Sequence, residues 1–136
     1  MLTLLSMVAL LFPMLIFMFA SPPLLILKHD TPKDAGFIRG LFSTYYTAVL
    51  VVAAVGTLCH ALAGRPAAAL AMGGVAAFVF ATRRWVLSRM DVLRGRIEAG
   101  DSAAIFRFRR LHIAGMLLNV VQLGAVAWGI VKFAAP

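Results

Sequence analysis

Four long apolar segments separated by short polar ones constrain this chain of 136 residues more than any other feature. An α-helix needs about 20 apolar residues to cross the hydrocarbon core of a membrane. In hydrocarbon every backbone group must be hydrogen-bonded within the protein, so such segments form helices. Hydrophobic residues make up 62% of the chain and charged residues 13%, whereas soluble domains are about half apolar and a quarter charged. The sequence predicts an all-α integral membrane protein, a single domain with four antiparallel spans at residues 2–27, 36–63, 67–86 and 111–133.

Glycine, proline and short polar residues mark the ends of the predicted helices. The polar segment 28–34 (KHDTPKD) joins the first two helices, and Gly64-Arg65-Pro66 forms a tight turn before the third. Glycine is favoured just after a helix and proline at its first position. By the same reasoning Gly100 ends the third helix, and Asp101 or Ser102 caps the fourth. The first helix is expected to belong to the mature protein, because no basic residue precedes its apolar core as in a signal peptide.

The third and fourth helices are expected to extend beyond the membrane as an arginine-rich hairpin. After Thr82 the helical pattern continues, and residues 83–110 hold eight arginines against three acidic residues. Basic side chains near a membrane surface bind anionic lipids with about 1 kcal/mol each. The predicted lipid-binding or partner-binding residues are Arg83, Arg84, Arg89, Arg107, Arg109 and Arg110. An acidic partner protein is the alternative ligand, and nothing resembles a fold that binds nucleic acid.

The distribution of basic residues predicts an orientation. Eleven of the thirteen lysines and arginines lie in segment 28–39 or in the hairpin, and only Arg65 and Lys132 lie at the opposite end. Because cytoplasmic loops are enriched in lysine and arginine, we expect both basic segments in the cytoplasm and both termini outside. The expected location is the plasma membrane, the inner membrane of a bacterium.

One face of the fourth helix carries unusual polarity for a membrane span. Steps of 100° per residue place Gly115, Asn119, Gln122, Val126 and Gly129 together, with His112 at the edge. This face is expected to point into the bundle. Two interpretations stay open: a pocket for a ligand, or amides that hold helices together at about 1 kcal/mol each. The residues of the candidate ligand pocket are His112, Asn119, Gln122, Tyr46 and Thr47.

The second helix supplies the last two of these residues. Ser43, Tyr46, Thr47, Ala54 and Thr57 fall on one weakly polar face, which we expect to match that of the fourth helix. Phe42, Tyr45 and Tyr46 lie near the start of the same helix, where aromatic residues are often found at a membrane interface.

Histidine and methionine residues raise the question of a haem or metal ion. His60 and His112 are expected at opposite membrane faces and cannot share an ion, whereas His29 and His112 lie on the same side and are able to meet. Met7 shares a helix face with Met14 and Met18, and thioethers suit Cu(I). No spacing typical of a metal site supports these ideas, so no metal ligands are predicted.

Small residues form a stripe along the third helix. Their spacing of four residues allows another helix to approach closely, which predicts a helix-packing surface made of Ala69, Gly73, Ala77 and Ala81.

Two stretches of the chain resemble a known family. These are AGFIRGLFSTYY in the second helix and RIEAGDSAAIFRFRRLHIAGMLLN, which runs from the end of the third helix into the fourth, with Arg110-Leu111-His112, Ala114-Gly115 and Leu118-Asn119 as the closing signature. This pattern resembles the bacterial domain of unknown function that is related to the eukaryotic transmembrane protein 205. The resemblance implies a four-helix membrane protein, and it implies no established biochemical activity.

Three functional hypotheses follow from the sequence. The first is an accessory or interaction component of a membrane complex, which binds a membrane protein partner or a second copy of itself. The second is a membrane oxidoreductase or small-ligand-binding protein that holds haem, quinone or copper near His112. The third is an oligomer that lets a small molecule permeate. No pattern of catalytic residues is visible, so we expect no hydrolase or phosphoryl transferase, and no cofactor is strongly indicated.

Overall fold

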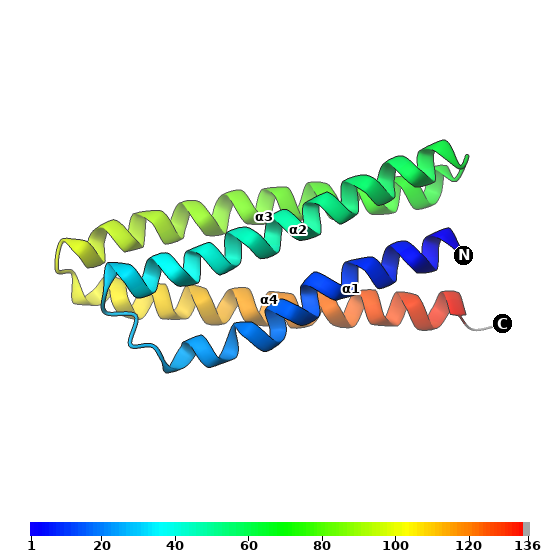
Figure 1. The fold of residues 1–136 in the computed structure, drawn as a ribbon. Coiled ribbons are helices and arrows are strands. Elements are labelled where there is room, and N and C mark those ends of the chain that lie inside the picture. The colour runs from blue at the N-terminus through cyan, green and yellow to red at the C-terminus, as the bar shows by residue number, and fades with distance from the viewer. Residues whose placement is uncertain (135–136) are drawn as a thin grey trace.

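The computed structural model describes residues 1–134, with side chains to Val131, and consists of four long helices that pack together. The elements are α1 (Leu2–Ala20), a 3₁₀ turn η1 (Pro22–Ile26), α2 (Pro32–Leu62), α3 (Pro66–Glu98) and α4 (Ser102–Ala134). No strand occurs among the described residues. The N-terminus, the α2–α3 turn and the end of α4 lie at one end of the molecule, and the other two connections lie at the opposite end (Figure 1). We call these the Gly64 end and the Gly100 end.

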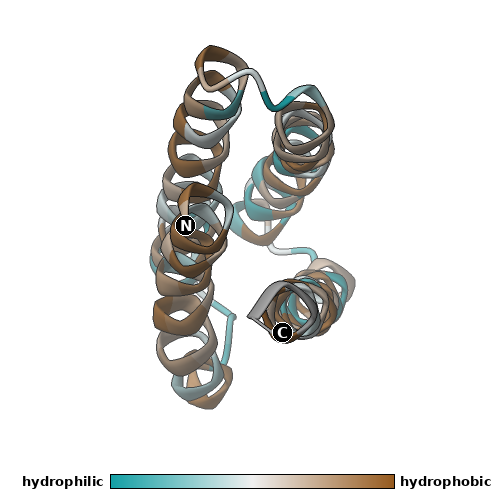
Figure 2. Cartoon of the chain, turned by 90° about the vertical axis from the view of Figure 1, so that its right-hand side faces the viewer, coloured by the Kyte–Doolittle hydropathy of each residue, from teal (hydrophilic) through white to brown (hydrophobic). Residues whose placement is uncertain are grey.

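All four helices are long and apolar enough to cross a membrane, as the sequence predicts. Within the most apolar 18-residue window of α3, and likewise of α4, only 11% of the residues are buried inside the chain. The remaining apolar surface therefore needs lipid or another protein against it. Apolar residues run along all the helices, and hydrophilic residues gather mainly at the connections (Figure 2).

The connections follow the predicted glycine and proline positions, with one difference. Gly64 (φ 66°) and Gly100 (φ 85°) both adopt the left-handed conformation that glycine allows without strain. The side chain of Asp101 accepts a hydrogen bond from the backbone N–H of Ala103 (2.9 Å), as a capping residue does. The first α-helix, however, ends at Ala20 instead of continuing to residue 27, because Pro22 and Pro23 lack the N–H groups that would extend it.

The aromatic residues near the start of α2 form the core of the bundle. Phe17 of α1 packs edge-on against Phe42 (4.8 Å between ring centroids) and stacks on Tyr45 (4.3 Å). Phe42, Tyr45 and Tyr46 are all buried. The three rings do cluster, but they face the core of the bundle and not a surface that lipid headgroups could reach.

The inward face of α2 also differs from the predicted one. Apart from His60, its buried positions are apolar or aromatic and recur at helical spacing, of which Ile38, Val49 and Ala53 are typical. Thr47 is exposed, and its hydroxyl donates to the Ser43 carbonyl of its own helix (2.8 Å). A threonine whose hydroxyl is satisfied in this way can face apolar surroundings, so polarity was a poor guide to the inward face.

The fourth helix packs as predicted. Gly115 and Asn119 are buried, while Ile113, Leu117 and Val121 are exposed. Gly115 allows α2 to approach: a Cβ atom at this position would overlap the Phe42 ring, with Cζ at only 2.7 Å.

Replacing Gly115 with alanine is therefore expected to lower the free energy of unfolding by about 1–3 kcal/mol. The measurement is the melting temperature of the purified protein in mild detergent. The matched control is Gly124→Ala on the same helix, where a Cβ would meet nothing within 4 Å and where alanine favours the helix. Equal destabilisation by both substitutions would contradict the close contact between α2 and α4.

Candidate functional site

A chain of three hydrogen-bonded side chains lies buried near the Gly100 end. His112 of α4 is fully buried, and its Nε2 atom is 2.9 Å from the hydroxyl of Ser21. Its Nδ1 atom is 3.1 Å from Nε2 of His29. The two contacts use both ring nitrogens of His112, so a polar ring inside an apolar bundle is fully paired. The meeting of His29 and His112, which the sequence left open, is confirmed.

The backbone brings His29 and Ser21 to His112 by unusual local structure. Ser21 lies where α1 stops, directly before Pro22 and Pro23. His29 has a positive φ of 62°, the only non-glycine residue with positive φ among those described. This left-handed conformation costs energy for a side chain with a Cβ atom, and here it accompanies the complete burial of the imidazole.

Aromatic rings enclose the histidine pair. Phe42 lies edge-on to His112 with 5.6 Å between ring centroids, and Phe108 lies 6.1 Å from His29. With both histidines neutral, the hydrogen bonds can run from Ser21 to His29 or in the opposite direction, because each imidazole has two tautomers.

The series of hydrogen bonds from Ser21 through His112 to His29 resembles the nucleophile, the base and the residue that orients the base in a hydrolase. The surroundings of Ser21, however, do not suit hydrolysis. Acyl transfer needs N–H donors around the oxyanion. The N–H of Ser21 is bonded to the Phe17 carbonyl (2.9 Å), and the next two residues are prolines without an N–H. Ser21 is also fully buried. The arrangement therefore fastens the α1–α2 connection to α4 instead of activating Ser21.

A metal ion finds too few ligands here. The pair supplies two nitrogen donors, whereas protein metal sites typically use three or four ligands. The residues described include no group of three histidine, cysteine, aspartate or glutamate side chains placed to hold an ion. His60 is buried near the Gly64 end with both ring nitrogens unpaired, so it has no part in the His112 cluster.

The other predicted pocket residues lie further along α4 and α2. The Tyr45 hydroxyl donates to Oε1 of Gln122 at 2.9 Å. Tyr46 is buried and packs against Tyr45 with 5.0 Å between rings. Asn119 is 1% exposed, and neither polar atom of its side chain has a hydrogen-bond partner. Thr47, exposed on α2, does not belong to this group.

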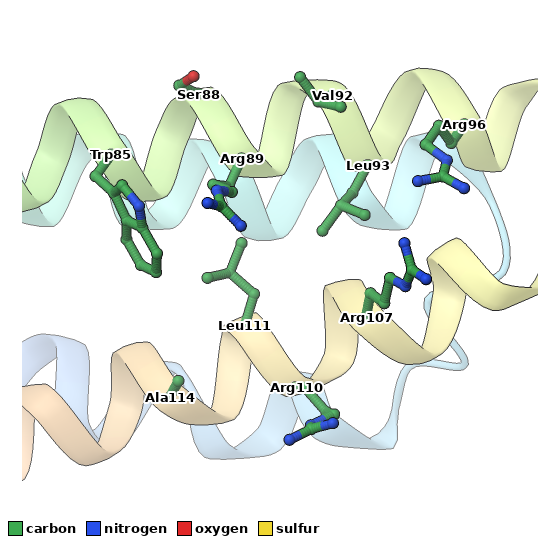
Figure 3. Close-up of a pocket in the computed structure, with 10 residues that line it drawn as sticks. All are labelled: Trp85, Ser88, Arg89, Val92, Leu93, Arg96, Arg107, Arg110, Leu111 and Ala114. Carbon is green, nitrogen blue, oxygen red and sulfur yellow. The ribbon is translucent and has the colours of Figure 1, made fainter.

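A second candidate site is a surface groove between α3 and α4 at the Gly100 end, with a volume of about 710 Å³. We call it the arginine groove (Figure 3). Its lining residues are Trp85, Ser88, Arg89, Val92, Leu93, Arg96, Arg107, Arg110, Leu111 and Ala114. Of the predicted lipid-binding or partner-binding residues, Arg89, Arg107 and Arg110 line the groove, and Arg83, Arg84 and Arg109 do not.

The positive charge of the arginine groove is poorly compensated. Arg96 forms an ion pair with Asp101, with 2.6 Å between the nitrogen and the carboxylate oxygen. Within the described part of the chain, Asp101 is the only carboxylate bonded to a groove arginine. Arg89 lies over the Trp85 ring (5.1 Å) and Arg110 over the Phe106 ring (5.7 Å). These cation–π contacts leave the full charge in place, so the groove attracts anions.

The stripe of small residues on α3 divides into two parts. Ala69 and Gly73 are half-buried, and a Cβ on Gly73 would lie 3.6 Å from Thr57 of α2. Ala77 and Ala81 are exposed. The predicted packing surface is therefore used partly within the chain, and its second half is open.

Comparisons of the chain with models of protein families, with curated proteins and with solved structures give no match. Function is therefore argued from the geometry of the two sites. Sequence reasoning missed Ser21 and Arg96. Pro22 and Pro23 could have drawn attention to Ser21, because they mark the point where the first helix ends. Arg96 could have been found because it lies one helical turn after Leu93, which also lines the groove.

The buried imidazole of His29 predicts a pH dependence of stability. Burial holds its pKa below the usual 6.5; the Leu27 backbone raises it, Arg109 lowers it, and Asp34 and Asp30 raise it by smaller amounts. Below about pH 6.5 the unfolded chain gains a proton that the folded chain resists, so stability falls as the pH falls.

His29→Asn is expected to reduce this loss, because asparagine tolerates a left-handed backbone and does not titrate. The measurement is the melting temperature in detergent from about pH 8 to about pH 5, a range that brackets the usual pKa of histidine. Parallel pH profiles for the variant and the original protein would contradict the assignment.

Proposed function

We propose that this chain is a non-enzymatic integral membrane protein that binds anionic lipid headgroups in its arginine groove and acts as an accessory component of a membrane assembly. The observation that carries the proposal is the groove itself, where four arginines meet one bonded carboxylate. Guanidinium groups bind phosphate through two parallel hydrogen bonds. A phosphate group is therefore the counter-charge that this surface fits best.

The proposal includes a topology. The helices cross the membrane as four antiparallel spans, with the Gly100 end in the cytoplasm and both termini outside. Support comes from the charge distribution, since the basic segments 28–39 and 83–110 meet at one end of the bundle and cytoplasmic loops attract such residues. The membrane is the bacterial inner membrane in this proposal.

The walls of the groove favour a lipid over a soluble anion. Apolar residues such as Val92, Leu93, Leu111 and Ala114 line it together with the arginines. The exposed Trp85 also lines it, and tryptophan is enriched at the level of lipid headgroups. Charged and apolar lining together match an amphiphile that carries a phosphate and acyl chains.

Assembly with a partner rests on the open half of the α3 stripe. Ala77 and Ala81 are exposed and small, and small residues let a second helix approach closely in a membrane. A membrane protein partner or a second copy of this chain is proposed to pack there. Membership of the transmembrane protein 205-like family stays a prediction.

The groove predicts selective retention of anionic lipid. The double variant Arg89→Gln/Arg107→Gln is expected to lose phosphatidylglycerol, because each arginine contributes about 1 kcal/mol to headgroup binding. The measurement is native mass spectrometry of protein extracted from mixed phosphatidylcholine and phosphatidylglycerol vesicles, with the retained lipids counted for each variant.

The control is Arg84→Gln/Arg94→Gln, which removes the same charge from the same helical hairpin outside the groove. This protein is expected to retain phosphatidylglycerol as the original protein does. Equal losses in the two double variants would mean that net charge alone governs binding, and would refute a site in the groove.

A further inference from the structure

The side chain of Asn119 is, with that of His60, one of two buried side chains whose polar atoms all lack a hydrogen-bond partner among the described residues. It is 1% exposed, and both its oxygen and its nitrogen lack hydrogen bonds. The Tyr45 hydroxyl lies near it but donates to Gln122 and does not meet hydrogen-bond geometry with the amide. Leaving a buried amide unpaired costs about 1–3 kcal/mol, so a partner from outside the chain is expected.

A cavity beside Asn119 provides room for that partner. Its volume is about 220 Å³, and it lies between α1 with η1 on one side and α4 on the other. A cavity of about 150 Å³ holds benzene, so this one accommodates a single substituted ring. Its lining residues are Phe17, Met18, Pro22, Met116, Asn119 and Val120.

The cavity borders the outer surface of the bundle. Met18 is 37% exposed and Val120 is 46% exposed, and both belong to helices with membrane-crossing length. A ligand dissolved in the membrane can therefore reach the cavity sideways without passing through water.

The depth of Asn119 restricts the kind of ligand. It follows Arg109 by ten residues, which corresponds to about 15 Å along a helix, or half the thickness of the hydrocarbon core. The ester carbonyls of phospholipids lie at the membrane interface, too far from this depth. The partner has to be a molecule that carries its own polar group into the hydrocarbon.

We propose that this cavity binds the ring of a lipid-soluble quinone, with Asn119 as the hydrogen-bonding residue. Both amide atoms are covered in the ligand-free chain, so the side chain turns toward the cavity when the quinone enters. Its N–H then donates to a quinone carbonyl, and its oxygen accepts from the hydroxyl of the reduced quinol. One side chain thus binds both forms without rearrangement of the backbone. Phe17, which stacks on Tyr45 in the core, forms the aromatic wall beside the ring. The inference rests on the proposed membrane topology, but the site is separate from the arginine groove, so a failure of headgroup binding would leave it standing.

The test is ligand-dependent thermal stability of the purified protein in mild detergent. The probe is a benzoquinone with a decyl tail, and the control ligand is decylbenzene, which has the same tail and ring size without carbonyl groups. The quinone is expected to raise the melting temperature by several degrees at saturation, because it binds only the folded protein. Decylbenzene is expected to produce a much smaller rise.

Asn119→Leu is expected to reduce quinone affinity at least about tenfold, as the loss of one buried hydrogen bond implies. Without ligand this variant should be at least as stable as the original protein, because it removes an unpaired amide. The matched control is Gln122→Leu on the same helix. Gln122 does not line the cavity, so this variant should bind quinone normally while being less stable, since Tyr45 loses its acceptor.

Three results would overturn the proposal. One is an equal shift of the melting temperature by the quinone and by decylbenzene. Another is unchanged quinone affinity in Asn119→Leu. The third is a ligand-free Asn119→Leu protein that is clearly less stable than the original, which would show that the amide already has a partner such as a bound water molecule.

Discussion

The burial of His112 is the constraint on which the Gly100 end of the bundle depends. An imidazole enclosed by apolar helices has to find hydrogen-bond partners, and the chain supplies them from Ser21 and His29. These two residues belong to the short connection between α1 and α2, where both prolines end the first helix. The connection is therefore held against α4, and its left-handed residue is kept in place by the contact that burial demands.

The same helix serves two different surfaces. Phe108, His112, Gly115 and Asn119 follow one another at helical spacing and face the core. Residues 107, 110, 111 and 114 share another face and line the arginine groove. Because both sets are fixed to one helix, the close contact between Gly115 and Phe42 determines where the groove arginines stand as well as where the histidine lies.

Much of the fold was predictable because it depends on local rules. The four long helices follow from the four apolar segments of the sequence, and the turns at Gly64 and Gly100 follow from the backbone freedom of glycine. The inward face of α4 followed from its glycine and amide residues. The inward face of α2 did not, because Thr47 satisfies its hydroxyl on its own helix. The contact between Ser21 and His112 joins residues 91 positions apart in the sequence. Helical periodicity concerns residues of one helix, so it could not predict this contact.

The two polar regions differ in the kind of partner that they require. In the His112 cluster both hydrogen bonds of the central ring close within the chain, and only Nδ1 of His29 stays without a partner in this cluster. The arginine groove and Asn119 each retain polar groups that the chain does not match: guanidinium charge in one case and an amide in the other. An unmatched charge at a surface is tolerated through water and salt, whereas an amide buried inside the bundle, as that of Asn119 is, has no contact with solvent. Because Asn119 also lines a cavity, its amide is a stronger indication of a specific ligand than the groove, even though the groove is the larger feature.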